Sequence, residues 1–145
     1  MDKLTVLVND FLKKYPLTVA WRIKKNCRVV ESHLNPGEDI IYAFAAQKNH
    51  SSFNIIGTAI VALTTERLVI GYKRVVFGYY FGSITPDLYN DLEIRSGILW
   101  GNVIIDTVKE KVELSNIQIK GLTEVETQIS EFMIVEKKKY ARMSD

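Results

Sequence analysis

The sequence predicts an α+β fold, mainly β, in which an antiparallel and strongly curved sheet is flanked by helices at both ends of the chain. Apolar residues recur at helical spacing before residue 36 and again after residue 122. Between residues 38 and 119 the pattern changes to short runs of β-branched and aromatic residues, separated by glycine, asparagine, aspartate or charged pairs. Turn signals at such regular intervals favour a small sandwich or barrel.

The bulk composition indicates one folded core. The length of 145 residues is that of a single domain, and 47% hydrophobic residues are typical of a globular protein. The 19 Lys and Arg against 17 Asp and Glu leave a net charge of +2, which is too small to attract a phosphate backbone, so we expect no nucleic-acid partner. Cys27 is the single cysteine, and no apolar run has the length of a signal peptide or a membrane span. These features predict a cytoplasmic location.

Residues 1–33 are predicted to form an N-terminal helical extension. The apolar stripe of a first helix comprises Leu4, Leu7, Val8, Phe11 and Tyr15. Pro16 interrupts this helix, because the residue before a proline avoids helical geometry. The stripe of a second helix comprises Val19, Ile23, Cys27, Val30 and Leu34. The turn signal at 35–37 is expected to end it.

Seven strands are expected in the region that follows. They are predicted at 40–47, 57–63, 68–73, 75–85, 92–95, 103–107 and 112–119. A polar loop, 48–52, separates the first two strands, and a tight turn, 64–66, separates the second from the third. Glycine inside a strand pattern often marks a bulge or a bend, so Gly78 and Gly82 predict curvature in the fourth strand.

A C-terminal helix is predicted to cap the sheet. Gly121 is expected to end the last strand, and Thr123 with Glu126 three residues later has the spacing of a capping box that opens a helix. The apolar stripe of this helix comprises Val125, Ile129, Phe132 and Met133. The lysines at 137–139 complement the negative end of the helix dipole.

Short motifs in the strand region resemble those of bacterial pleckstrin-homology-like (PH-like) domains. Residues 34–38 read L-N-P-G-E, residues 63–70 read L-T-T-E-R-L-V-I and residues 89–92 read Y-N-D-L, in the order and spacing of that family, followed by Ile104, Ile105 and Thr107. The resemblance implies a PH-like superfold for residues 34–145, with about seven antiparallel strands in a curved sheet or barrel capped by the C-terminal helix. This superfold serves lipid, peptide and protein partners alike, so it implies binding without naming the ligand.

Four basic residues are candidates for ligand binding, namely Arg67, Lys73, Arg74 and Lys48. The family pattern singles out Arg67, and a guanidinium beside a tight turn can receive an anion. The alternative is that Arg67 pairs with a carboxylate or with turn carbonyls. Phosphoinositide-binding PH domains carry several basic residues across the first hairpin, whereas this loop offers only Lys48 and His50. The sequence therefore argues against headgroup binding at that loop.

Four apolar residues are candidates for an interface, namely Tyr80, Trp21, Trp100 and Ile23. Aromatic side chains are enriched at interface anchors, and the alternative for each is a place in the core. Strand alternation predicts Tyr79 and Phe81 on one face and Tyr80 on the other. Homo-oligomerisation is expected through a sheet edge or through the stripe of the second helix.

Basic residues also gather in the N-terminal helices, at Lys13, Lys14, Arg22, Lys24, Lys25 and Arg28. Such a helix can lie on an anionic membrane, and the alternative is an ordinary solvated face. The leading prediction is a non-enzymatic binding or assembly module whose partner is another protein or a second copy of itself. The alternative prediction is a peripheral membrane module that binds anionic lipid through the basic helices.

Catalytic and metal chemistry are not predicted. His33, His50 and Cys27 cannot form a three-ligand zinc site without help from carboxylates, so we expect no metal. The sequence contains none of the motifs GxxxxGK[ST], GxSxG and HExxH. We therefore expect neither a cofactor nor enzymatic activity.

Overall fold

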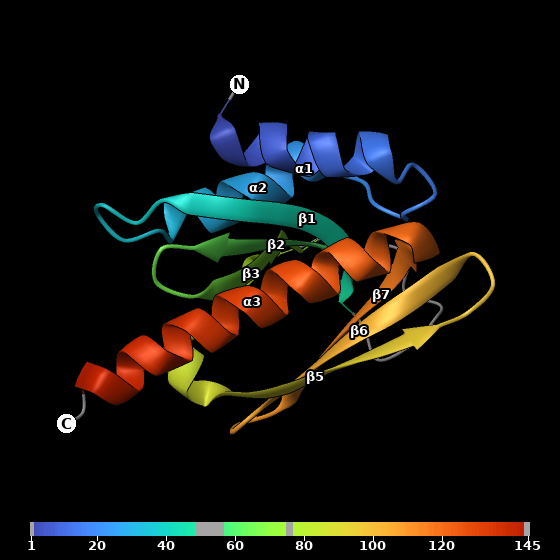
Figure 1. Cartoon of the computed structure of the whole chain (residues 1–145). Helices are drawn as coiled ribbons and strands as arrows, with labels where there is room; N and C mark the ends of the chain where they lie inside the picture. Colours follow the sequence, from blue (N-terminus) through green and yellow to red (C-terminus); the bar gives the residue numbers. More distant parts are fainter. Residues whose placement is uncertain (1, 49–56, 75–76, 144–145) are drawn as a thin grey trace.

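The computed structural model describes residues 2–48, 57–74 and 77–143, which form two N-terminal helices, one antiparallel sheet and a long C-terminal helix (Figure 1). The helices are α1 (Lys3–Lys14), α2 (Ile23–Ser32) and α3 (Ile119–Met143), with a short 3-10 helix η1 (Pro86–Leu88). The strands are β1 (Ile40–Lys48), β2 (Thr58–Thr64), β3 (Leu68–Lys73), β4 (Tyr79–Ile84), β5 (Tyr89–Ser96), β6 (Trp100–Thr107) and β7 (Lys111–Gln118).

The seven strands follow the order β4-β3-β2-β1-β7-β6-β5, and every neighbouring pair is antiparallel. β1 pairs with β2 along most of its length but with β7 only at its end, through Gln47 and Lys48. The sheet therefore turns at β1 and curls into a half-barrel, with β4 and β5 as its two edges. The predicted fold class, a curved seven-stranded sheet with a C-terminal helix and an N-terminal helical extension, is confirmed.

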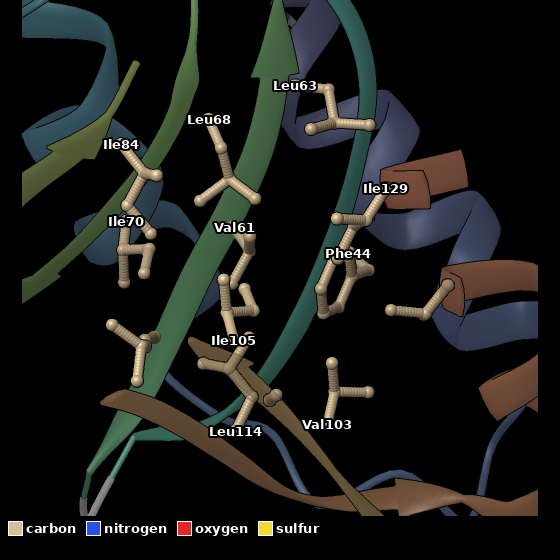
Figure 2. Packing of buried hydrophobic residues seen from close by; sticks show 14 of the residues in the cluster. Phe44, Val61, Leu63, Leu68, Ile70, Ile84, Val103, Ile105, Leu114 and Ile129 are labelled. Carbon is tan, nitrogen blue, oxygen red and sulfur yellow. The ribbon is translucent and has the colours of Figure 1, made fainter. Parts of the chain in front are cut away.

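The inner core lies inside the curl and is closed by α3. Figure 2 shows side chains from both halves of the sheet meeting there, among them Phe44, Val61, Ile105 and Leu114. α3 contributes a fully buried stripe at Val125, Ile129 and Met133. This i, i+4, i+8 spacing places the three side chains on one helix face, as the sequence predicts.

A second core lies on the outer face of β1, β2 and β3, beneath α1 and α2. Its side chains come from both helices and from every second residue of the three strands: Leu4, Val8, Cys27, Val30, Ala43, Ala45, Ile60, Ala62 and Val69. Small residues on the outer face of the sheet allow the helices to pack close to it. A Cβ added at Gly71, for example, would lie 2.8 Å from Val30 Cγ2. The middle strands are thus buried on both faces, which explains their continuous apolar runs.

Two helix boundaries differ from the prediction. The second helix spans Ile23–Ser32, whereas Val19 lies in the preceding loop, where its backbone N–H donates to the Asn116 carbonyl at 3.0 Å. The capping box and the strand end at Gly121 are wrong, because β7 passes directly into α3 at Ile119 and Thr123 lies inside the helix. Gly121 instead makes room for α1, since a Cβ there would lie 3.0 Å from the Tyr15 ring.

The strand boundaries differ mainly around the glycines of the fourth strand. β4 begins at Tyr79, after Gly78 has turned the chain with a φ of +69°. Residues 75–76 of the predicted fourth strand lie outside the described residues, and so do residues 49–52 of the predicted polar loop. Of the two alternatives predicted at Gly82, a bulge or a bend, the bulge is wrong, because β3 and β4 pair without a register shift. Gly82 instead leaves space for a neighbouring ring, since a Cβ there would lie 2.5 Å from Tyr80 Oη. β5 and β6 both begin three residues earlier than predicted.

Candidate functional site

Arg67 fastens the end of α2 to the β2–β3 turn. Its Nε donates to Glu38 Oε2 and its Nη2 to Glu38 Oε1, both at 3.0 Å, and Nη2 also donates to the His33 carbonyl at 3.0 Å. Burial is the largest single influence on the pKa of Glu38 and raises it, but the hydrogen bonds from Arg67, from the Asn35 N–H and from the Thr64 hydroxyl, together with the charge of Arg67, outweigh burial and hold the pKa of this carboxyl below its usual value. The Arg67 side chain is 14% exposed and that of Glu38 is 0% exposed, so this arginine is committed to a buried, bidentate ion pair.

Lys48 and Tyr80 come together at the end of β1. The Lys48 ammonium lies 4.5 Å from the centroid of the Tyr80 ring, and that ring stacks on Tyr72 at 5.3 Å. Tyr80 packs against the inner core, whereas Phe81 stacks on His33 beside α2 at 4.5 Å and Tyr79 lies 4.8 Å from the same ring. The predicted alternation of these three aromatic residues is what the structure shows.

The remaining interface candidates lie apart from Tyr80. Trp21 precedes α2 and is 44% exposed, and its backbone N–H donates to Thr58 Oγ1. Ile23 packs against the outer core from α2. Trp100 opens β6 and donates from Nε1 to the Leu17 carbonyl at 2.6 Å. The second helical stripe, one predicted route to homo-oligomerisation, is covered by the sheet because Cys27 and Val30 are buried in the outer core.

Lys73, another ligand candidate, lines a groove between α2 and the β3–β4 hairpin, which we call the basic groove. Its volume is about 400 Å³, and it is lined by Lys25, Arg28, Val29, Ser32, Lys73, Gly78 and Tyr79. Three of these side chains are cationic and none is a carboxylate. Arg74 follows β3 and is exposed, but it does not line the groove. Of the four ligand candidates, Lys73 lines this groove, whereas Arg67, Lys48 and Arg74 do not.

A buried amide fixes the two walls of the basic groove relative to each other. Asn26 on α2 donates from Nδ2 to the carbonyls of Trp21 and Thr58, and its Oδ1 accepts the backbone N–H of Lys73 at 2.8 Å. The backbone carbonyl of Lys73 in turn accepts a hydrogen bond from Nη1 of Arg22, at 3.3 Å. The position of Lys73 at the end of β3 is therefore set from α2 through both of its backbone polar groups.

The charges of the basic groove have few local partners. Within the part of the chain that the structure describes, the ammonium groups of Lys25 and Lys73 form no ion pair. Arg28 is close enough to Glu31 to lower the pKa of that carboxyl somewhat, but burial and the contact with Asp2 dominate and raise it to about 7. The first turn of α2 carries no acidic residue. The groove is therefore a local region of positive potential on a chain that is nearly neutral overall.

Sequence reasoning identified only part of this site. Lys25 and Arg28 were grouped with all basic residues of the N-terminal helices, and Lys73 was a separate candidate; Tyr79 and Ser32 were not linked to either. The spacing i, i+3 places Lys25 and Arg28 on neighbouring positions of one helix face. No signal within the sequence shows that this face meets the end of β3, because the contact depends on how α2 packs across the sheet.

The geometry defines a PH-like half-barrel with two additional helices on its outer face. The family model described as Bacterial PH domain matches residues 34–131, more than half of the chain, and the chain belongs to this family. The resemblance to bacterial PH-like domains is thereby confirmed. Among solved structures the chain is similar to a pleckstrin homology domain from Shewanella amazonensis SB2B, with 12% sequence identity over 74% of this chain and 82% of that one and a TM-score of 0.46. No curated protein matches.

In residues 2–48, 57–74 and 77–143, no group of three or more His, Cys, Asp and Glu side chains is arranged to hold a metal ion. Over the same residues, none of the helices combines the length and the apolar character needed to cross a membrane.

Proposed function

We propose that this member of the bacterial PH domain family is a non-enzymatic binding module whose basic groove receives an acidic segment of a protein partner. The observation that carries the proposal is the convergence of Lys25, Arg28 and Lys73 on one groove without a carboxylate among its lining residues. Cations held close together repel one another, and an anionic ligand relieves that repulsion. Surface lysines that already pair with nearby carboxylates would gain no such relief of repulsion from an anionic ligand.

The shape and lining of the groove favour a polypeptide as the ligand. A volume of about 400 Å³ accommodates several side chains, and Val29 and Tyr79 offer apolar contact beside the cations. Tyr79 is 54% exposed and its ring contacts that of His33, and a tyrosine side chain, with two rotatable bonds, can cover a peptide at little cost in side-chain entropy. β4, the edge strand that begins at Tyr79, pairs with β3 on one side and with no other strand of residues 2–48, 57–74 and 77–143, so an extended segment can pair with its other side.

The experiment that tests the proposal measures the fluorescence anisotropy of a labelled acidic peptide of alternating Glu and Ser. We expect binding that weakens as salt is added, and a loss of about tenfold or more in affinity, roughly 1.4 kcal/mol, in the triple variant K25Q/R28Q/K73Q. The matched control K13Q/K109Q/K138Q removes the same total charge from exposed positions outside the groove and should bind like the unaltered chain. Equal loss in both variants, or no binding at low salt, contradicts the proposal.

A second candidate function, binding to an anionic membrane surface, is supported by one observation. Phe77 is 83% exposed, close in sequence to Lys73 and Arg74, and a protruding aromatic side chain beside cations is typical of proteins that bind lipid surfaces. Co-sedimentation with phosphatidylserine vesicles, and its loss in Phe77→Ser with the peptide affinity unchanged, would establish this function. Absence of co-sedimentation at low salt would remove it.

A further inference from the structure

The connector between α1 and α2, residues 15–22, crosses one end of the sheet and is fastened there. The backbone N–H of Leu17 donates to Gln118 Oε1 at 2.8 Å, and its carbonyl accepts Nε1 of Trp100 at 2.6 Å. Further along the connector, the Trp21 N–H donates to a threonine hydroxyl of β2. In Figure 1 this connector, the β5–β6 turn and the start of α3 lie together at the right of the molecule. The side chains of the connector are therefore held beside those of the turn.

Five large apolar side chains at this end of the sheet are exposed to solvent. We call them the apolar rim, and they are Leu17, Trp21, Ile98, Leu99 and Trp100. Ile98, at the tip of the β5–β6 turn, is 93% exposed. The Gly97 N–H donates to the Trp100 carbonyl across this turn, and the Leu99 carbonyl accepts the first N–H of α3. Single exposed apolar residues are ordinary, but five of them on neighbouring, hydrogen-bonded segments mark a surface for binding.

The segments that carry the apolar rim are basic and contain no carboxylate. Residues 11–30 include six Lys and Arg and no Asp or Glu. Residues 94–105 and 114–123 include one cation each, Arg95 and Lys120, and also no Asp or Glu. The ammonium of Lys120 forms no ion pair among the described residues. The apolar rim thus belongs to a local excess of positive charge on a chain whose net charge is only +2.

An anionic bilayer offers both kinds of contact that this surface requires. Acyl chains begin about 5–10 Å below the headgroups, within reach of a protruding turn, and anionic headgroups attract the cations around it. Tryptophan is enriched at the boundary between the two layers. The one polar group of the Trp100 side chain is already paired with the Leu17 carbonyl, so the exposed part of its ring is free to contact lipid without an unpaired donor.

We propose that the apolar rim inserts into the surface of an anionic membrane, with Ile98 at the greatest depth and the cations of residues 11–30 at the level of the headgroups. This inference goes beyond the proposed function, because the rim contributes no residue to the basic groove. It also differs from the membrane candidate at Phe77, which lies in the β3–β4 turn and is not part of the rim.

The test follows tryptophan fluorescence of the full chain as vesicles are added. The chain has two tryptophans, and both belong to the apolar rim, so their emission reports directly on insertion. With phosphatidylcholine vesicles that contain about 30% phosphatidylserine, we expect a blue shift and quenching by lipids brominated in the acyl chains. Affinity should fall at least about tenfold on vesicles of phosphatidylcholine alone, and added salt should weaken the binding.

The double variant I98S/L99S removes the apolar side chains of the turn. We expect its co-sedimentation with the anionic vesicles to be about tenfold weaker or less, because it lacks the surface that the acyl chains would cover. The matched control V108S/I134S removes two exposed apolar side chains outside the rim and should bind vesicles like the unaltered chain. I98S/L99S should also bind the acidic peptide with unchanged affinity, since neither residue lines the basic groove.

Four outcomes would overturn the inference. The first is no binding to the anionic vesicles at low salt, whatever the affinity for the acidic peptide, so the proposed function can stand when this inference fails. The second is binding without quenching by the brominated lipids, since the chain would then rest on the headgroups through its charges alone. The others are equal losses in I98S/L99S and V108S/I134S, and a loss in Phe77→Ser alone. Circular dichroism confirms that each variant is folded, and Ile98→Ser alone makes the same test if the double variant is not.

Discussion

The two ends of β3 carry cations in opposite circumstances. Arg67 precedes the strand and is buried against Glu38, with hydrogen bonds that also reach the end of α2. Lys73 ends the strand, is exposed, and forms no ion pair among the described residues, although its backbone is held from α2. Six residues apart, one cation stabilises the fold and the other is available to a ligand. The presence of a basic residue therefore does not identify a binding site. What identifies the site is whether that residue already has an ion-pair partner within the fold.

The largest expected effect tests the structural side of this comparison. Arg67→Ala leaves the buried Glu38 carboxylate without its partner, and breaking a buried ion pair in this way costs about 3–5 kcal/mol of unfolding free energy. Urea denaturation followed by tryptophan fluorescence measures the loss. If Arg67→Ala kept its stability but no longer bound the acidic peptide, Arg67 would belong to the ligand site instead.

The next effect tests the amide that joins the two walls of the basic groove. Asn26→Ala leaves the backbone N–H of Lys73 and the carbonyl of Thr58 without their side-chain partner, at a cost of about 1–3 kcal/mol. We also expect weaker peptide binding, although Asn26 does not line the groove, because Lys73 is no longer fixed relative to α2. If the Asn26→Ala variant were less stable but bound the acidic peptide with unchanged affinity, the groove would not depend on the hydrogen bonds of Asn26.

A smaller effect concerns pH and the contact between α1 and α2. Burial first, and then the contact with Asp2, raises the pKa of Glu31 from 4.5 to about 7, so the folded chain holds this proton where the unfolded chain releases it. The stabilisation is complete below pH 4.5 and is lost as pH rises towards 7. We expect the unfolding free energy to fall between these values and Glu31→Gln to flatten the profile.

The control for this pH dependence is the other carboxyl of the pair. The contact with Glu31 is the main cause that lowers the pKa of Asp2 from 3.8 to about 2, so its contribution is present above pH 3.8 and is lost only as pH falls towards 2. Asp2→Asn removes this contribution in acid, and it also removes the contact that helps to raise the pKa of Glu31, so the fall in stability above pH 4.5 should be smaller and should end at a lower pH than in the native chain. Urea midpoints measured at intervals from about pH 2 to about pH 8 separate the two contributions. A Glu31→Gln profile that keeps the full slope of the native chain would contradict this assignment.

The smallest effect tests the functional side of the comparison. Lys73→Gln removes an exposed charge with no ion-pair partner among the described residues, so the unfolding free energy should change by no more than about 0.5 kcal/mol. Peptide affinity should fall, and its dependence on salt should become shallower because one charge fewer takes part. A destabilisation comparable to that of Arg67→Ala would make Lys73 a structural residue as well.

Much of the fold could be predicted because its signals are local. Helical spacing located α1 and the buried stripe of α3, and alternation placed Tyr80 opposite Tyr79 and Phe81. The predictions that failed concern residues whose role depends on a tertiary contact and not on the local pattern. Gly121 has the appearance of a strand terminator, but it lies inside α3, where a Cβ would come within 3.0 Å of the Tyr15 ring. Gly82 has the appearance of a bulge, but it provides space for Tyr80.

The sequence by itself determined the class of protein, since the L-N-P-G-E and L-T-T-E-R-L motifs and the succession of strands place the chain in the bacterial PH domain family. It could not determine which basic residues have partners. Glu38 reaches Arg67 across 29 positions of sequence, and Asn26 reaches Lys73 across 47. The pairing of β1, β2 and β3 brings Glu38 to Arg67, and the packing of α2 on the sheet brings Asn26 to Lys73. The same packing of α2 leaves Lys25, Arg28 and Lys73 around one groove. Hydrogen bonds act over a few ångströms of space, whatever the separation along the chain.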